Sequence, residues 1–180
     1  MNIVWIIVIA VVIILLLIVV GIYNKLVGMR NRVKDQWSQI DVQLKRRFDL
    51  IPNLVETVKG YAKHEKSVIK EVSDARKTLV AAKGIEQKVK ANRILEDSLG
   101  RLFAIAENYP DLKANTNFLE LQRELSSTED RVAYARQNYN DSILTYNMLC
   151  EKFPGVIFAN VFKRTKKEYI KIQEDEKKTP

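Results

Sequence analysis

The sequence predicts an all-α protein in which an N-terminal transmembrane helix is followed by an antiparallel, up-down four-helix bundle. Three observations predict this class. The first 24 of the 180 residues contain no Asp, Glu, Lys or Arg. The rest of the chain repeats apolar residues at spacings of about three and four, which is typical of helices packed on one face. With only six glycines and four prolines, the chain favours long helices over a turn-rich β fold.

The first element is an apolar run from Ile3 to Tyr23. Its 21 residues span roughly 30 Å at the rise of an α-helix, the thickness of a bilayer's hydrocarbon core. Trp5 and Tyr23 stand near its two ends, where amphipathic rings favour the membrane interface. A cleaved secretory signal is the alternative, but a signal has a basic start and a shorter apolar core. Residues 1–24 are therefore predicted to be a membrane anchor.

Basic residues flank this run on one side only. None precedes it, whereas Lys25, Arg30 and Arg32 follow it closely. Because Lys and Arg stay on the cytoplasmic side, we expect a single-pass protein of the cell membrane, with its N-terminus outside and its bundle in the cytoplasm.

Two helices are predicted around Pro52. The first covers residues 25–47, and the second covers residues 50–82. Proline disfavours the helical conformation of the residue before it and suits the first turn of a new helix. Pro52 therefore marks either a hairpin or a kink in one long helix, and we favour the hairpin. The predicted inward positions are Leu26, Val33, Trp37, Ile40, Leu44, Leu54, Val55, Val58, Ala62, Val68, Val72, Ala75 and Leu79.

The second half of the chain predicts two more helices. One covers residues 85–108, and the other opens at Thr116 and runs to residue 152, with a loop over 109–115 between them. Pro154-Gly155 ends the fourth helix, and a short apolar stretch follows over 156–162. Residues 25–162 are thus predicted to be the bundle domain, and residues 163–180 a charged, frayed tail. The predicted inward positions are Val89, Ile94, Leu95, Leu99, Leu102, Phe103, Ala106, Phe118, Leu121, Leu125, Thr128, Val132, Ala135, Tyr139, Ser142, Tyr146 and Leu149.

The formal net charge of +8 is concentrated at the two ends of the soluble part. Residues 25–50 carry +4 and residues 163–180 carry +3, which leaves +1 for the rest. Four helices return the chain to the membrane, so we expect residues 156–162 to contact anionic lipid together with Lys163, Arg164, Lys166 and Lys167. The alternative is that this stretch packs across the open end of the bundle. No nucleic-acid motif surrounds the basic residues, and we expect no nucleic-acid partner.

Residues that carry chemistry are scarce. His64 is the only histidine, no zinc-protease or di-iron motif surrounds it, and no glycine-rich phosphate loop exists. We expect His64 on the surface and Cys150, the only cysteine, packed inside. The cluster Lys45-Arg46-Arg47 is interpreted as cations at a helix C-terminus, with an anionic partner or lipid as the alternative. The sequence therefore predicts no enzyme, no catalytic residue, no metal site and no cofactor.

A long block over residues 35–65, DQWSQIDVQLKRRFDLIPNLVETVKGYAKHE, resembles the signature of the LemA family of bacterial membrane proteins. The resemblance continues in Ala75-Arg76, Asn108–Asn115, Ala135-Arg136, Tyr139-Asn140 and Phe153-Pro154-Gly155, so it covers essentially the whole chain. The chain departs from the family at Phe162-Lys163-Arg164, where the family often reads Phe-Gly-Phe. The resemblance implies an anchor followed by a four-helix bundle, with a hairpin at Pro52, and it brings no established enzymatic activity or cofactor.

These observations favour a non-enzymatic, membrane-anchored scaffold that recruits a protein partner on the cytoplasmic face, with self-association left open. Relatives in the family take part in magnetosome membrane formation, and family members are often encoded near membrane zinc proteases, so the resemblance implies a role in membrane organisation or quality control. The alternative is a membrane-tethered sensor with a ligand pocket between the helices, gated by residues 108–115. Five polar residues that a core does not need are the candidate partner contacts: Gln39, Gln43, Asp49, Asn53 and Glu56.

Overall fold

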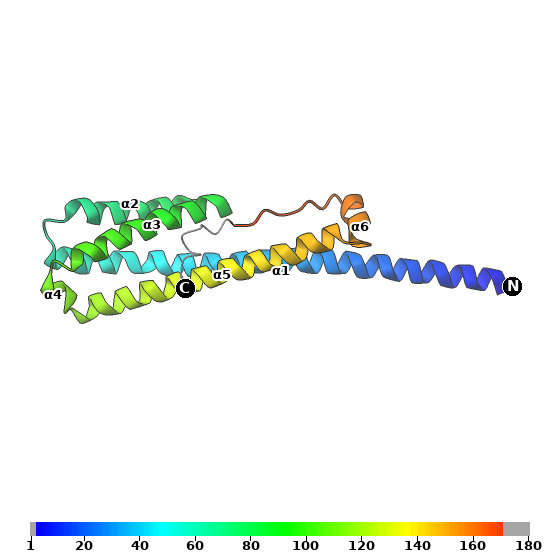
Figure 1. Ribbon diagram of the computed structural model, residues 1–180, viewed down its shortest axis with the longest axis horizontal. Coiled ribbons are helices and arrows are strands. Elements are labelled where there is room, and N and C mark those ends of the chain that lie inside the picture. The colour runs from blue at the N-terminus through cyan, green and yellow to red at the C-terminus, as the bar shows by residue number, and fades with distance from the viewer. Residues whose placement is uncertain (1–2, 171–180) are drawn as a thin grey trace. The chain divides into compact units, whose positions relative to one another are not determined.

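A computed structural model describes residues 3–170, which form helices, turns and one unwound segment, with no strand among them. The helices are α1 (Ile3–Tyr61), α2 (Lys66–Ala81), α3 (Ile85–Ala106), α4 (Pro110–Lys113), α5 (Thr116–Glu151) and α6 (Gly155–Val161) (Figure 1). The predicted all-α class and the long apolar N-terminal helix are confirmed. The up-down order of the bundle and the domain boundaries at residues 24 and 162 stay predictions.

The hairpin predicted at Pro52 is wrong, because α1 continues through Pro52 to Tyr61. A proline within a helix has no N–H, so the carbonyl group four residues earlier loses its hydrogen bond. Here that carbonyl belongs to Phe48, and Arg76 of α2 donates to it from Nε at 2.9 Å. The Arg76 guanidinium also lies 5.8 Å from the centre of the Phe48 ring. The hydrogen bond that Pro52 removes is thus replaced from another helix.

The first reversal of the chain falls at Ala62–Glu65 instead, between α1 and α2. Residues 50–61 of the second predicted helix therefore belong to α1. The predicted helix over 85–108 matches α3, and the one over 116–152 matches α5. Four long helical segments remain after the apolar run, as predicted, but the first one is longer and the second shorter.

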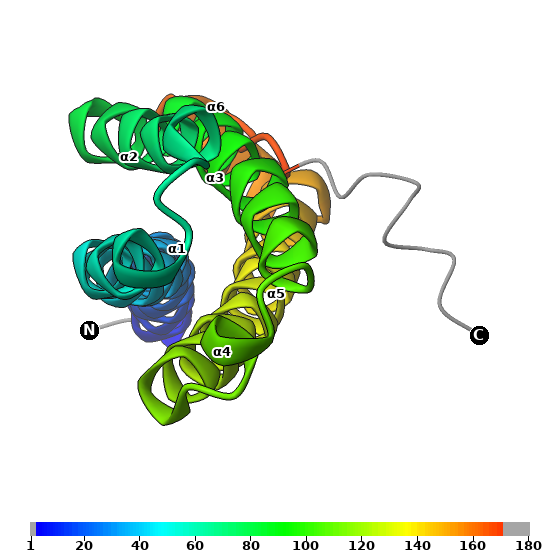
Figure 2. The same cartoon turned by 90° about the vertical axis from the view of Figure 1, so that its left-hand side faces the viewer.

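Residues 37–136 form one compact unit. Its core takes residues from α1, α2, α3, α4 and α5, including Leu54, Val72, Leu95 and Leu112, none of which is measurably exposed. Each such side chain contributes about 1.5–3 kcal/mol on burial. Figure 2 views this unit from the α4 end and shows α2 beside α3 and α3 beside α5. Ile94, predicted to face inward, is exposed.

One end of this unit is closed by side-chain hydrogen bonds. Asn115 caps α5, since its Oδ1 accepts from the Phe118 N–H at 3.0 Å, so the cap lies one residue before the predicted Thr116. The Asn115 amide nitrogen donates to the Tyr61 hydroxyl at 2.9 Å. The Tyr109 hydroxyl donates to Glu65 at 2.9 Å, which raises the pKa of Tyr109. These bonds hold residues 108–115 against the turn between α1 and α2.

The second compact unit takes residues 3–36 and 137–170 of the described chain. Its buried side chains include Leu26 and Val33 of α1 and Tyr139, Ile143 and Tyr146 of α5. α6 packs closely on the end of α5, because a Cβ added at Gly155 would lie 2.0 Å from the Leu149 carbonyl oxygen. Only glycine fits this corner.

α6 ends in a left-handed turn. The Arg164 N–H donates to the Ala159 carbonyl at 2.8 Å and the Lys163 N–H to the Asn160 carbonyl at 3.1 Å, the pair of bonds of a Schellman motif. Lys163 has φ of 50°, in the left-handed region that favours glycine. The departure from the family pattern, Lys163 in place of Gly, therefore falls on the residue where this turn needs glycine most.

The tail predicted to be frayed is ordered over residues 163–170. This segment is unwound and runs along α5, where side chains of α5 bind its backbone (Figure 1). The remaining tail residues, 171–180, lie outside the described residues.

Candidate functional site

The apolar segment of α1 presents its side chains outward. Among the described residues α1 alone is long and apolar enough to cross a membrane, and none of its most apolar window is buried. The large apolar side chains from Ile3 to Val20 are mostly exposed, Trp5 at 63%. A core helix of a soluble protein would have buried these side chains. This surface is a candidate membrane contact by length, composition and exposure.

α6 lies against the C-terminal end of this apolar segment. The Tyr23 and Phe162 rings meet edge to face with their centres 5.1 Å apart, and Phe162 stacks with Phe158 at 6.5 Å. Gly155 and Ala159 are buried on the inner side of α6, whereas Ile157 and Val161 are 50% and 67% exposed on the outer side. An apolar outer face therefore stands beside the end of the candidate span.

The predicted membrane-interface cations divide into three groups. Lys25, Arg30, Arg32 and Lys163 are exposed. Lys166 pairs with Glu151, and the Lys167 ammonium lies 6.0 Å from the centre of the Tyr146 ring, so both lie against α5. Arg164 is half-buried. The four tail cations therefore differ in their surroundings. Lys163, next to α6, is exposed, and the structure gives no ion pair for it.

Tyr146 shows that α1, α5 and the tail meet in this unit. Burial and a hydrogen bond with Cys150 raise the pKa of Tyr146, while the guanidinium groups of Arg164 and Arg30 oppose the rise. Arg30 belongs to α1 and Arg164 to the tail, so α1 and the tail both place a positive charge near this phenol of α5. Cys150 is buried, as predicted.

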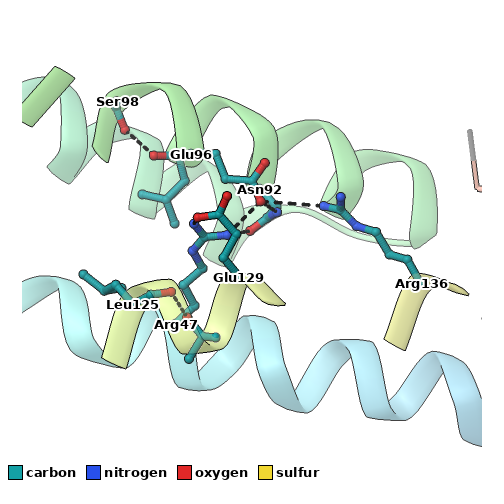
Figure 3. Close-up of polar contacts among 9 residues, drawn as sticks. Arg47, Asn92, Glu96, Ser98, Leu125, Glu129 and Arg136 are labelled. Atoms are coloured by element: carbon teal, nitrogen blue, oxygen red, sulfur yellow. Dashed lines mark hydrogen bonds and ion pairs between the residues drawn. The ribbon is translucent and has the colours of Figure 1, made fainter. Parts of the chain in front are cut away.

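A second site, in the unit of residues 37–136, is a buried polar cluster around Arg47 (Figure 3). The Arg47 side chain of α1 is 2% exposed. Its Nη1 donates to Glu96 of α3 at 2.7 Å and its Nη2 to Glu129 of α5 at 3.2 Å. Asn92 donates to the same Glu96 oxygen at 2.7 Å, and Arg136 approaches that oxygen at 3.9 Å.

Two cations and two carboxylates balance the charge of this cluster. Because the partners come from α1, α3 and α5, the cluster fixes these helices against one another in one register. Every carboxylate in it is paired with a guanidinium, which suits a structural role better than proton transfer.

The interpretation of Lys45-Arg46-Arg47 as cations at a helix C-terminus is wrong, because α1 ends at Tyr61. The sequence did hold a signal for Arg47. Ile40, Leu44, Ile51 and Leu54 are buried at the spacings of three and four that Arg47 shares, so Arg47 occupies a core position of α1. Lys45 and Arg46, beside it, are exposed, and Arg46 lies 3.8 Å from Glu124.

The candidate partner contacts lie on α1, and its continuity brings them onto one helix. Gln39, Asp49, Asn53 and Glu56 are exposed on the side away from the core positions. Gln43 differs, since it is half-buried and its Oε1 is buried with no hydrogen-bond partner among the described residues. Four of the five thus remain candidates for a contact surface.

Little else in the described chain points to chemistry. His64 is exposed in the turn between α1 and α2, as predicted for a surface residue. Residues 3–170 contain no group of three or more His, Cys, Asp or Glu placed to hold a metal ion. An open groove of about 410 Å³ runs between α1, α2 and α3, lined by Asp41, Phe48 and Lys88 among others. Residues 108–115 do not line it.

Comparison with known proteins gives one consistent result. The LemA family model matches residues 36–180. The magnetosome protein MamQ of Magnetospirillum gryphiswaldense is 32% identical over 170 residues, which cover 79% of this chain and 62% of the relative. The magnetosome protein MamQ 2 of Paramagnetospirillum magneticum is 31% identical over the same coverage. Protein LemA of Metamycoplasma hominis is 26% identical over 129 residues, 71% of this chain and 59% of the relative.

The chain spans about three fifths of the length of these relatives. The family match begins in the middle of α1 and continues through α6, so it includes the Arg47 cluster and α6 but not Tyr23. Together with the exposed apolar segment, it indicates a membrane-associated protein. This chain belongs to the LemA family.

Proposed function

We propose that this protein is a non-enzymatic, single-pass membrane scaffold that holds a protein partner on the cytoplasmic face. One observation carries the proposal: the same helix, α1, bears the exposed apolar segment and the exposed polar face of Gln39, Asp49, Asn53 and Glu56. A partner bound to that face is joined to the membrane through continuous helix, with no loop between Ile3 and Tyr61.

The cytoplasmic placement rests on the one-sided basic residues. Lys25, Arg30 and Arg32 are exposed just after the apolar segment, as residues held at an anionic cytoplasmic surface would be. The similarity to magnetosome proteins supports a role in organising a membrane surface.

α6 adds a second membrane contact in this proposal. Its outer residues Ile157 and Val161 are exposed apolar side chains, and Phe162, the residue after α6, packs against Tyr23, where the apolar segment ends. A short apolar face at that level inserts among lipid headgroups, and the exposed Lys163 next to it binds anionic lipid.

Partner binding is tested by site-specific photo-crosslinking in intact cells. A photoreactive amino acid replaces Asn53 in one variant and Asp130, an exposed residue of α5, in the matched control. We expect the Asn53 variant to give a reproducible crosslinked protein band that the Asp130 variant lacks. Lipid adducts alone, or the same adducts at both positions, would count against a partner on α1.

Orientation is tested by cysteine labelling in a Cys150→Ser background. A cysteine in place of Tyr134, which is 67% exposed, should react with a membrane-impermeant maleimide only after the cells are lysed. A cysteine in place of Asn2 should react in intact spheroplasts. The opposite pattern would reverse the predicted topology.

The second contact is tested on the full chain in vesicles of phosphatidylethanolamine and phosphatidylglycerol. An environment-sensitive fluorophore at position 157 should be quenched by lipids that carry a quencher in their acyl chains, whereas the same fluorophore at position 134 should not. Equal quenching at the two positions would contradict a membrane contact of α6.

A further inference from the structure

Two asparagines of α5 bind the backbone of the tail in the same way. The Asn147 amide nitrogen donates to the Lys167 carbonyl and its Oδ1 accepts from the Lys167 N–H, both at 2.9 Å. Asn140 makes the same two bonds, both at 2.9 Å, with the carbonyl and N–H of Ile170. Each side-chain amide therefore bonds both the backbone N–H and the backbone carbonyl of one tail residue.

The spacing of the two pairs fits an unwound chain on a helix. Asn140 and Asn147 are separated by two helical turns, a rise of about 10.5 Å. Lys167 and Ile170 are separated by three residues, and a chain with the three-residue period of polyproline II rises about 9.3 Å over that distance. The same period returns every third residue to one side of the chain. Both amides can thus bind at once without distortion of helix or tail.

Side-chain burial and an ion pair support this alignment of the tail on α5. Ile170 is buried, with 6% of its surface exposed, and Asn147 is 7% exposed. Lys166 pairs with Glu151 of α5, and this hydrogen bond raises the pKa of Lys166. Tyr169 and Glu168, which lie between the two bound residues, are exposed. The tail is thus bound through its backbone at Lys167 and Ile170, and the two residues between them are exposed.

The bound tail also closes a loop around α6. α5 leads into α6 at Gly155, the Schellman turn at Lys163 reverses the chain, and residues 164–170 return along α5. α6 therefore stands between two segments of chain that the asparagines hold together.

We propose that the face of α5 bearing Asn140 and Asn147 is a binding site for an unwound polypeptide main chain. Its ligand is residues 164–170 of the same molecule. This binding holds α6 beside the end of the apolar segment. The last part rests on the proposed membrane contact of α6. The first two parts do not, and they are tested separately.

The test of main-chain binding uses proline substitutions in the full chain, reconstituted in the same anionic vesicles. Lys167→Pro removes the backbone N–H that donates to Asn147 Oδ1. Glu168→Pro removes a backbone N–H for which the structure gives no hydrogen bond. Both prolines suit the polyproline II conformation. We expect hydrogen exchange at Ile170 to be at least about tenfold faster in Lys167→Pro than in wild type, and unchanged in Glu168→Pro.

Lys167→Ala controls for the lost ammonium near Tyr146 and should keep the protection of Ile170. An Ile170 amide that exchanges freely in wild type would overturn the site. Equal loss of protection in both proline variants would overturn main-chain recognition at Lys167.

The positioning of α6 is tested with the fluorophore at position 157. In Lys167→Pro the quenching by lipid should fall several-fold, while Glu168→Pro keeps it. If the tail is released and the quenching stays the same, the tail does not position α6. If the wild type shows a protected Ile170 but no quenching, the membrane contact of α6 fails and the tail site stands.

A final experiment tests whether the tail binds α5 of its own molecule or α5 of a neighbouring molecule. Leu144 of α5 and Tyr169 of the tail are both exposed and line the same surface groove. With Cys150→Ser, cysteines at both positions of one chain should be joined within that chain by a short bifunctional maleimide. Crosslinks between two chains that carry one cysteine each would show exchange between copies and overturn the assignment to the same molecule.

Discussion

Arg47 is a charged residue at a position of α1 where its neighbours in the core are apolar. Its guanidinium is accommodated because Glu96, Glu129 and Asn92 supply acceptors from two other helices. An ion pair of this kind often adds little net stability over an apolar core, but loss of one partner leaves charge buried and unpaired.

We therefore expect Arg47→Ala to lower the free energy of unfolding by about 3–5 kcal/mol. Arg46→Ala is the matched control, since the Arg46 and Glu124 side chains are 51% and 41% exposed and their pair contributes about 1 kcal/mol or less. Chemical denaturation of the detergent-solubilised chain, followed by circular dichroism, measures both. Equal losses in the two variants would contradict a structural role for the cluster.

Lys163 occupies the left-handed residue of the turn after α6. A side chain with a Cβ is disfavoured there by roughly 1–2 kcal/mol, and glycine is not. Lys163→Gly should therefore raise the free energy of unfolding by about 1 kcal/mol. Gly84→Ala, which places a Cβ at φ of 81°, is the converse test and should lower the same quantity. A destabilised Lys163→Gly variant would show that the lysine contributes more to folding than the turn geometry implies.

At the scale of elements, the continuity of α1 depends on a residue of α2. The local sequence around Pro52 indicates a break, and Arg76, which replaces the missing bond, lies 28 residues from Phe48 along the chain. Local patterns do not show such a partner, so the hairpin was predicted and is wrong. The same error led to Arg47 being interpreted as a helix-end cation.

What the sequence could predict followed from periodicity. The ends of α3 and α5, and most buried positions, were predictable because the apolar residues repeat at helical spacing whatever the partner helices are. The ordered tail was not predictable in this way. Its order comes from Asn140 and Asn147, whose side chains carry no apolar signal and bind a backbone rather than particular side chains.

A double-mutant cycle tests the compensation at Pro52. Arg76→Met should lower the free energy of unfolding by about 1–3 kcal/mol, because the Phe48 carbonyl is then left without a donor. In a Pro52→Ala background the helix supplies its own N–H, so the same substitution should have a smaller effect. Additive effects of the two substitutions in denaturation curves would contradict the compensation.

At the scale of the whole molecule, charge is placed where the two candidate membrane contacts lie. Exposed Lys25, Arg30 and Arg32 follow the apolar segment, and exposed Lys163 follows α6. Each cation near an anionic surface contributes about 1 kcal/mol, and salt screens it.

Lys163→Ala should therefore reduce the quenching of a fluorophore at position 157 in anionic vesicles, and high salt should have the same effect on the wild type. Lys166→Ala removes an equal charge that is already paired with Glu151, so it should change the quenching less. Vesicles of phosphatidylcholine alone serve as the reference. Equal effects of the two substitutions would show that the ion pair in the tail does not matter at the membrane.

The amide pairs of Asn140 and Asn147 have a consequence for how this protein evolves. Since the bonds are made to peptide groups, mutations at positions 168 and 169 leave them intact, and even at 167 the main exclusion is proline. The tail can therefore accumulate substitutions, including changes of charge suited to a membrane of different lipid composition, without loss of its attachment. Selection should act strongly on the two asparagines and weakly on the residues that they hold.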